Sequence, residues 1–415
     1  AAPAALMSAD RDRFWARVGA VLTGTAVAQA IPILGSLVLA RLYAPAAFGL
    51  FAAWLGLAQL AAVAATGRYE NALALEGDGE PRRTAALATL AVVAGAGTLI
   101  LVASLLVLTV GGIAGVPLAM LLLFAPTAVA IATSQVALAW AAGEGRFGAM
   151  SGMRIAQAAA VTGTQIVAGA LWPSAGALAV AQLVGLLLGL AWALRALPLR
   201  SGAFPARARM AAFWHARRRF PLLSLPADGI NTAAAQLPLL VVGIRFGAEA
   251  AGCLALTLRV LAAPVGLLGS AVLDVFKRDS AAAFRERGEC RAIFDRTFCV
   301  LATGSAVVAL ALAVTAEPLF AAAFGERWRL AGTMALWLLP LFALRFVASP
   351  LSYLFYVAGK QHVDLVWQGL LLAMTLATLW ASADARGALI AYSAGYSAMY
   401  GVYLFLSCRY SRGCT

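Results

Sequence analysis

Two long stretches without Asp, Glu, Lys or Arg limit what this chain can fold into. The first covers residues 84–143, a run of 60, and the second covers residues 155–194, a run of 40. A helix needs about 20 apolar residues to cross the hydrocarbon core of a bilayer, so each run holds two such helices. Turn residues near the middle of each run, Gly111–Gly112 and Pro173–Ser174, divide it into a hairpin. Helices in a soluble core would need polar faces, and these have almost none. The sequence therefore predicts an all-α integral membrane protein.

Apolar stretches bounded by turns and charges predict twelve transmembrane helices in two bundles of six. Their expected limits are 17–40, 47–68, 84–110, 117–142, 153–171, 176–197, 220–244, 250–275, 297–322, 331–357, 362–381 and 385–407. The longest connection is basic and lies at the middle of the chain. We therefore expect an N-terminal bundle over residues 1–198, a cytoplasmic linker over 199–219 and a C-terminal bundle over 220–415.

Lys and Arg are distributed unevenly between the two sides of the predicted spans. Of the 31, 24 fall on the side of the N-terminus and five on the other, while Arg259 and Arg345 fall inside spans. The positive-inside rule then places both termini in the cytoplasm of a bacterial inner membrane. It also accounts for the net charge of +13 without nucleic acid as a partner. The Arg217–Arg219 cluster is expected to meet anionic lipid headgroups. We expect translation to start at Met7, with a first span too long for a cleaved signal peptide.

The residues that usually build catalytic or metal sites are sparse. The five cysteines form no CxxC pair, and His215 and His362 share no ligand spacing. No phosphate-binding loop for ATP is present. The sequence therefore predicts no catalytic residue, no metal site and no cofactor. The predicted external loops are only a few residues long, which disfavours an integral-membrane polymerase or glycosyltransferase, because such an enzyme needs acid/base groups on a substantial loop.

The first spans of the two halves resemble each other. Three features recur at nearly constant offsets of 206, 204 and 203 residues: Pro32 and Pro238, Arg41 and Arg245, Gly49 and Gly252. Six spans in each half keep the two halves in the same orientation, which makes this a parallel repeat. Repeats of this kind are typical of transporters, with the substrate site between the halves. Chance similarity between two apolar helices is the alternative.

Charged residues at membrane depth are costly and usually face a cavity, so each is a candidate for substrate binding. Arg345 lies in the middle of its predicted span, where its side chain cannot easily reach the interface. Arg259 lies nearer the outer end of its span, where its side chain can extend to the membrane interface. A structural ion pair is the alternative for Arg345. One guanidinium group can bind two phosphate oxygens at once, and it stays charged when it is desolvated.

Polar side chains at helical spacing mark three further spans as candidate cavity walls. Asp228, Asn231 and Gln236 share one face of the seventh span, Gln29 belongs to a stripe on the first, and Arg154 heads a stripe on the fifth. Hydrogen bonds between neighbouring helices are the alternative reading of these groups. Asp228 is open to two interpretations, a binding group for a coupling proton or sodium ion, and a partner of an arginine.

Arg68 and Glu70 lie at the cytoplasmic end of the second predicted span. Two charges of opposite sign at this place are candidates for a gate that opens and closes during transport. A plain interfacial anchor is the alternative for the pair. Together with Asp228 they form the predicted ion-coupling or gating group.

Several short motifs lie along the chain: Leu39–Gly49, Gly67–Ala72, Phe246–Gly252, Phe324–Trp328 and Ser349–Leu351. Together they resemble bacterial polysaccharide flippases of the Wzx type, in the multidrug/oligosaccharidyl-lipid/polysaccharide (MOP) exporter superfamily. The resemblance extends over nearly the whole chain. It implies two six-helix bundles, as in the multidrug transporters called MATE, and alternating access. It also implies an undecaprenyl-pyrophosphate-linked oligosaccharide as substrate, an O-antigen or exopolysaccharide repeat unit moved from the cytoplasmic to the periplasmic leaflet.

The sequence leaves two transporter hypotheses. The first is this flippase, with the pyrophosphate held by arginines and the sugar enclosed by polar walls. The second is a cation-coupled exporter of drugs or small molecules of the same superfamily, which would favour acids over arginines near the middle of the membrane. We expect a monomer, because the repeat already supplies two halves, working with polysaccharide-assembly proteins.

Overall fold

The computed structural model describes residues 23–113, 115–196, 204–358 and 360–413, and within them it shows helices and turns but no strand. Residues 1–22 and 197–203, which hold parts of the first predicted span and of the predicted linker, lie outside the described residues. Twelve of the described helices are long enough to cross a bilayer. They are Thr23–Leu42, α2 (Pro45–Thr66), α3 (Glu80–Thr109), α4 (Leu118–Gly143), α5 (Phe147–Leu171), α6 (Ala175–Ala196), α8 (Leu225–Phe246), α9 (Ala248–Arg287), α10 (Arg291–Phe324), α11 (Arg329–Leu351), α13 (Gln361–Ala381) and α14 (Ala385–Tyr410).

Length and hydropathy together mark ten of these helices as candidate membrane spans. The other two are α5 and α13, of 25 and 21 residues. Five shorter helices complete the described chain: η1 (Tyr69–Leu75), α7 (Arg207–Ala216), the π-helical turn η3 (Phe220–Ser224), η4 (Glu326–Trp328) and α12 (Leu354–Val357). The prediction of an all-helical membrane protein is confirmed.

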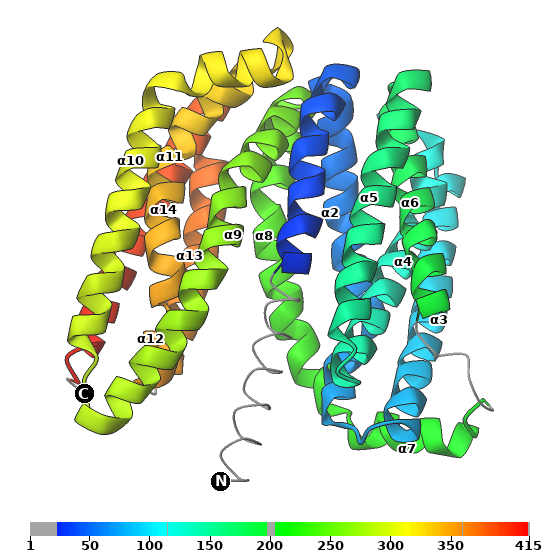
Figure 1. The fold of residues 1–415 in the computed structure, drawn as a ribbon. Coiled ribbons are helices and arrows are strands. Elements are labelled where there is room, and N and C mark those ends of the chain that lie inside the picture. The colour runs from blue at the N-terminus through cyan, green and yellow to red at the C-terminus, as the bar shows by residue number, and fades with distance from the viewer. Residues whose placement is uncertain (1–22, 114, 197–203, 359, 414–415) are drawn as a thin grey trace. The chain divides into compact units, whose positions relative to one another are not determined.

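The chain divides into two compact units, residues 1–236 and 237–415, and the division falls inside α8. In unit 1, α4 packs against α2, α3 and α6 (Figure 1). Most of its buried residues are small, and Ala128, Ala132 and Val136 are fully buried at a spacing of four. Small residues let helix backbones approach closely, which is how helices associate where the solvent is lipid.

Two glycines set the close packing of α5 on α6. A Cβ on Gly185 would collide with the backbone of Val161, and a Cβ on Gly189 would lie 2.8 Å from the Cβ of Gln157. Four residues separate the two glycines, so both lie on the face of α6 that meets α5. This is the GxxxG arrangement of membrane helix pairs.

In unit 2, α11 packs against α9, α10 and α14. Thr257 on α9 donates its hydroxyl to the carbonyl of Ala331 on α11 at 2.7 Å, and Ser305 on α10 donates to Ala343 at 2.8 Å. These bonds add to an apolar interface in which Ala331 and Leu338 are fully buried. On the other side of α14 lies α13.

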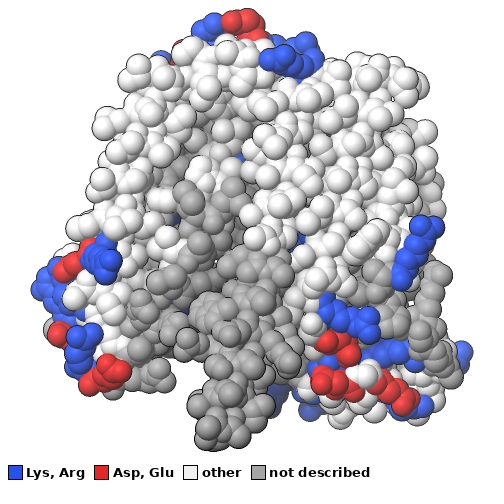
Figure 2. Space-filling view, viewed as in Figure 1, with Lys and Arg blue, Asp and Glu red and all other residues white. Residues whose placement is uncertain are grey.

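The surfaces of both units fit a membrane. Charged atoms gather at the helix ends of each unit, with broad uncharged surface between them (Figure 2). In unit 1 the exposed pair Arg209–Glu80 lies in such an end zone, and in unit 2 the exposed pair Arg329–Glu326 does. The middle of α10 is apolar and open, with Val314 82% exposed. Such a surface is stable when it faces lipid.

Two predicted helix limits differ from the structure. The span predicted over 331–357 is two helices, because α11 ends at Leu351 just after Pro350, and α12 begins at Leu354. Proline lacks the N–H that would continue the helical ladder. The span predicted over 250–275 belongs to a 40-residue helix, α9, that ends at Arg287. Hydropathy marks only the part of a helix within the bilayer and not its polar extension.

Candidate functional site

Arg345 lies on α11 in unit 2 and is exposed on the protein surface. Its guanidinium carbon lies 5.8 Å from the centre of the Phe342 ring. Within the described part of the chain it forms no ion pair, since none of the eight ion pairs includes it. The acid partner that was the alternative explanation of Arg345 is therefore not found among the described side chains. No described carboxylate therefore compensates its charge.

Arg259 lies on α9, which packs against α11 in the same unit. Its side chain is half-buried and takes part in interactions with other groups of the chain. Of the two arginines predicted inside spans, Arg345 is thus the more open.

The polar residues of α5 bridge neighbouring helices of unit 1. Arg154 donates from Nη1 to the Thr25 hydroxyl at 2.8 Å, and this bond joins α5 to the helix Thr23–Leu42. Gln157 donates to Ser134 on α4 at 3.2 Å, and Gln165 donates to Gln182 on α6 at 3.1 Å. These amides therefore make helix–helix hydrogen bonds. Arg154 keeps further N–H groups for other partners.

Gln29, Asn231 and Gln236 lie in unit 1 in different surroundings. Gln29 and Asn231 are exposed. Gln236 on α8 donates to the Oε1 of Gln59 on α2 at 3.1 Å. Gly56 makes room for it, because a Cβ there would lie 2.7 Å from the Gln236 Oε1. The predicted polar stripe of α8 therefore combines one helix–helix bond with an exposed amide.

Arg68, Glu70 and Asp228 form one ionic cluster. The Arg68 Nε donates to the Oδ2 of Asp228 at 2.7 Å, and its Nη1 lies 2.9 Å from the Oε1 of Glu70. The structure thus brings together the three residues predicted for gating or ion coupling, although 160 positions separate Arg68 from Asp228. Asp228 pairs with an arginine, one of its two predicted interpretations.

The backbone of this cluster is unusual. Helix α2 ends at Gly67 in the left-handed conformation, and Arg68 follows with a φ of 59°, the only positive φ among the described non-glycine residues. A long side chain rarely adopts this conformation. This left-handed turn leads the chain into η1. Glu70, which is only 5% exposed, then lies next to the Arg68 side chain. Neither Glu70 oxygen has a hydrogen bond of good geometry to a described group.

A second ionic cluster in unit 1 was not predicted. Arg82 at the start of α3 is 4% exposed and donates from Nη1 to Asp78 at 2.6 Å and to Glu144 at 2.8 Å. Its Nε and Nη2 donate to the carbonyls of Leu73 and Glu76. In the sequence Arg82 is one of many arginines predicted on the cytoplasmic side, and no local signal separates it from them.

The helix α7 runs across the end of α3, against which it packs (Figure 1). Met210 and Phe213 are buried, and the Trp214 indole donates to the carbonyl of Ala88. Arg217 just after α7 pairs with Glu76 at 2.7 Å. Tyr69 contacts the Phe213 ring, and burial raises the pKa of its hydroxyl. The second half of the predicted linker is therefore fastened to unit 1.

The tyrosines of α14 were also missed. Tyr392, Tyr396 and Tyr400 follow one another at a spacing of four. Neighbouring rings have centroids 4.8 Å and 5.7 Å apart. The spacing is visible in the sequence, but a search for charged groups passes over it.

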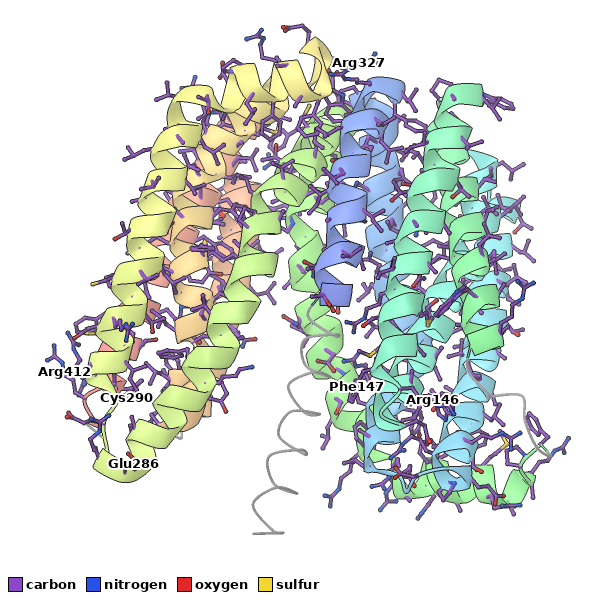
Figure 3. The ribbon with its side chains drawn as sticks, viewed as in Figure 1. Arg146, Phe147, Glu286, Cys290, Arg327 and Arg412 are labelled. Carbon is purple, nitrogen blue, oxygen red and sulfur yellow. The ribbon has the colours of Figure 1, made fainter. Side chains whose placement is uncertain are left out.

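In unit 2, Glu286, Cys290 and Arg412 lie at one end, and Arg327 lies at the other (Figure 3).

The described residues contain no group of three or more His, Cys, Asp or Glu arranged to hold a metal ion.

Comparison with known proteins gives both a family and a fold. Residues 38–332 match the family described as polysaccharide biosynthesis protein. No curated protein sequence matches the chain. Among solved structures it is similar to the lipid II flippase MurJ in an inward closed conformation, with a TM-score of 0.73 and 12% identity over 94% of this chain and 87% of that one.

Two transporter structures are similar as well. An inward-facing multidrug resistance MATE family transporter of the MOP superfamily has a TM-score of 0.68 and 15% identity over 92% of this chain and 94% of that one. A MOP superfamily transporter from Pyrococcus furiosus has a TM-score of 0.55 and 15% identity over 94% of each chain. The predicted twelve-helix fold and the resemblance to the superfamily are confirmed. Since the family match extends over more than half of the chain, the protein belongs to the polysaccharide biosynthesis protein family and has the fold of the MOP superfamily.

Proposed function

We propose that the protein is a flippase that moves a polyprenyl-pyrophosphate-linked oligosaccharide across the membrane by alternating access. The observation that carries this proposal is Arg345, an exposed arginine on a membrane-spanning helix without an ion pair to a described residue. An unpaired cation at membrane depth is costly, and an anionic substrate would offset that cost. Membership of a polysaccharide biosynthesis family and the similarity to a lipid II flippase support a lipid-linked glycan.

The chemistry of the guanidinium group suits a pyrophosphate. It stays charged when desolvated and offers a planar set of N–H donors that match two phosphate oxygens at once. In this proposal Arg345 and Arg259 bind the pyrophosphate. The polar residues of unit 1 that the sequence predicts as cavity walls, Arg154, Gln29, Asn231 and Gln236, stay a prediction, and the polyprenyl tail is proposed to stay in lipid.

The cluster of Arg68, Glu70 and Asp228 is proposed to gate the cycle and couple it to a proton or sodium ion. One guanidinium is shared between two carboxylates, with 2.7 Å to Asp228 and 2.9 Å to Glu70. A proton or Na⁺ on one carboxylate would weaken its hold on Arg68. Such competition links ion binding to the contact between Arg68, which directly precedes η1, and α8, which carries Asp228. No other cofactor is proposed.

We further propose the bacterial inner membrane as the location, with both termini in the cytoplasm and a monomer as the working form. The basic segment Arg217–Arg219 would contact anionic headgroups there. Polysaccharide-assembly proteins are the expected partners. An enzymatic role is disfavoured, because connections such as Trp172–Ser174 and Ser382–Asp384 hold no folded domain that could carry catalytic groups.

A cation-coupled exporter of drugs is the second candidate. It is favoured by the buried carboxylate Glu70, which has no well-formed hydrogen bond, and by the similarity to a multidrug transporter fold. An exporter of cations would place acids at the substrate site. In unit 2 the exposed charge in the middle of α11 is instead an arginine, Arg345, which favours the flippase.

The proposal is tested by complementation of a flippase-deficient strain with the wild-type chain and with Arg345→Ala, at matched membrane expression. The wild type should restore surface glycan, and Arg345→Ala should accumulate lipid-linked precursor inside, with Arg345→Lys intermediate. The matched control is Arg329→Ala, which removes an exposed arginine at the start of the same helix and should complement fully. Failure of the wild type with every glycan tested, together with resistance to cationic drugs, would establish the exporter instead.

A further inference from the structure

The tyrosines of α14 belong to a group of aromatic rings in contact in unit 2. Tyr392, Tyr396 and Tyr400 lie on one face of the helix. Trp367 on α13 extends the surface, with ring centroids 5.5 Å from Tyr400 and 4.4 Å from Tyr403. The Trp367 indole donates to the carbonyl of Met399 at 3.1 Å, which fixes the ring in place. Five aromatic rings from two helices therefore make one continuous patch, which we call the tyrosine face.

Arg345 belongs to the same region of unit 2. Helix α11 packs against α14, and Val347, two residues after Arg345, lies in the same apolar cluster as Leu404, one turn after Tyr400. The two helices therefore bring Arg345 to the level of Tyr400, where its charge acts on the hydroxyls of Tyr392 and Tyr400. Tyr392 is buried, whereas Tyr396 and Tyr400 are partly exposed. The open part of the tyrosine face therefore presents aromatic rings and hydroxyl groups next to an exposed guanidinium.

Packing alone does not account for this combination. Phenylalanine would fill the same space without placing hydroxyl groups in a membrane-spanning segment, where each polar group needs a partner. An arginine without an ion pair to a described residue adds a second cost at the same place. Binding sites for small ligands commonly join an aromatic wall with a few converging polar groups, as these residues do.

We infer that the tyrosine face and Arg345 form one binding site for a sugar phosphate, with the phosphate on Arg345 and the adjoining sugar ring against Tyr396 and Tyr400. The C–H groups on one face of a sugar ring can lie flat on an aromatic ring, while its hydroxyl groups at the edge reach the phenolic oxygens. Tyr392 is a positioning residue that packs its ring against Tyr396, with ring centroids 4.8 Å apart. This inference deepens the proposed flippase function, on which it rests, because it assigns recognition of the first sugar to α14.

The test measures binding by the purified full chain in detergent, with glucose 1-phosphate, galactose 1-phosphate and inorganic phosphate as probes. The wild type should bind at least one sugar phosphate at least fivefold more tightly than inorganic phosphate. Tyr396→Leu and Tyr400→Leu should remove this advantage and leave the affinity for inorganic phosphate unchanged. Arg345→Ala should lose all three probes. Tyr396→Phe keeps the ring but loses the hydroxyl, so it should retain only part of the advantage and fall between the wild type and Tyr396→Leu, which also shows that the site still folds.

The matched control is Phe405→Leu, which removes an aromatic ring of α14 that is 67% exposed and is not part of the tyrosine face. It should change no affinity. The inference is overturned if both sugar phosphates bind the wild type no better than inorganic phosphate, or if Tyr396→Leu weakens all probes equally.

Complementation separates this outcome from the proposed function. If no glycan complements but the sugar advantage depends on Tyr396 and Tyr400, the site stands and the flippase proposal fails. If complementation depends on Arg345 but no sugar advantage exists, the flippase proposal stands and the site fails.

Discussion

The guanidinium of Arg82 is enclosed by acceptors from three segments of unit 1. It meets the carboxylates of Asp78 and Glu144 and the carbonyls of Leu73 and Glu76. Glu144 follows α4, so the Arg82 side chain links the end of α4 to η1 and to the start of α3. Removal of one partner of a buried ion pair leaves the other charge without compensation.

Arg82→Ala should therefore lower the free energy of unfolding by about 3–5 kcal/mol. The control is Arg209→Ala, whose ion pair with Glu80 is exposed and should contribute only about 0–1 kcal/mol. Thermal unfolding in detergent measures both. Equal shifts of the two variants would show that burial of Arg82 contributes nothing.

Cys290 gives a prediction of pH dependence outside the membrane-spanning segments. Burial, and the neighbouring charge of Glu289, raise the pKa of this thiol to about 11. The thiolate is the reactive form, so its fraction at pH 8 is small and keeps rising until pH passes about 11. In a variant whose other four cysteines are alanine, alkylation of Cys290 in the folded state should accelerate through pH 9–10. A plateau near pH 9, as for an ordinary thiol, would refute the assignment, and denatured protein supplies that reference.

A site residue can be predicted from the sequence when it departs from the local pattern around it. Arg345 and Arg259 are visible because a charge inside a predicted span is rare. Asp228 is also visible, but its pairing with Arg68 depends on the left-handed turn after Gly67, which no local pattern indicates. Arg82 could not be predicted, because its role comes from acceptors brought together by the fold. The spacing of Tyr392, Tyr396 and Tyr400 is visible in the sequence, but it predicts no binding site without the position of Arg345.

At the scale of helices, the contact between α5 and α6 depends on the absence of side chains. Gly185→Leu places atoms where the backbone of Val161 lies and should destabilise unit 1 by about 1–3 kcal/mol, with lower yield of folded protein. Gly163→Leu on α5 is the control, because a Cβ there meets no atom within 4 Å. Size-exclusion profiles and thermal unfolding report both effects. A wild-type profile for Gly185→Leu would show that the two helices are not held this closely.

The hydropathy pattern predicted where helices cross the membrane better than where they end. All twelve spans have a counterpart, including α5, whose polar stripe lowers its hydropathy. Extensions such as the last turns of α9 are polar and helical at once, so hydropathy does not detect them. The short helix α7 lies in a basic segment, and its buried Met210 and Phe213 gave no clear period.

Helix α8 has an open position near its start. A Cβ on Gly229 meets no atom within 4 Å, so Gly229→Ala fits the structure and makes the helix stiffer, by about 1 kcal/mol in helix propensity. If bending of α8 is part of the transport cycle, this variant should complement poorly while substrate binding is unchanged. Gly304→Ala on α10, equally free of contacts, is the control. Full complementation by Gly229→Ala would show that α8 moves as a rigid element.

For the whole molecule, the distribution of Lys and Arg predicts which end of unit 2 faces the cytoplasm. Arg412 and Arg327 lie at opposite ends of this unit (Figure 3). In a chain whose native cysteines are alanine, Arg327→Cys should react with a membrane-impermeant maleimide added outside cells with a permeable outer membrane. Arg412→Cys should react only after lysis. The reverse pattern would invert the orientation, and labelling of both sites in intact cells would exclude a single orientation.

Because α7 packs on unit 1, the segment that joins the two units is helix α8 and not the predicted linker. Residues from Arg207 to Arg217 are held to unit 1 by Trp214, Arg217 and their partners, and the division between units falls later, at Gln236 in α8. The covalent connection is therefore a helix and not a slack tether. A tether transmits only tension, whereas a helix also transmits torque and compression, so rotation of either unit is passed along α8 to the Asp228–Arg68 pair near its start.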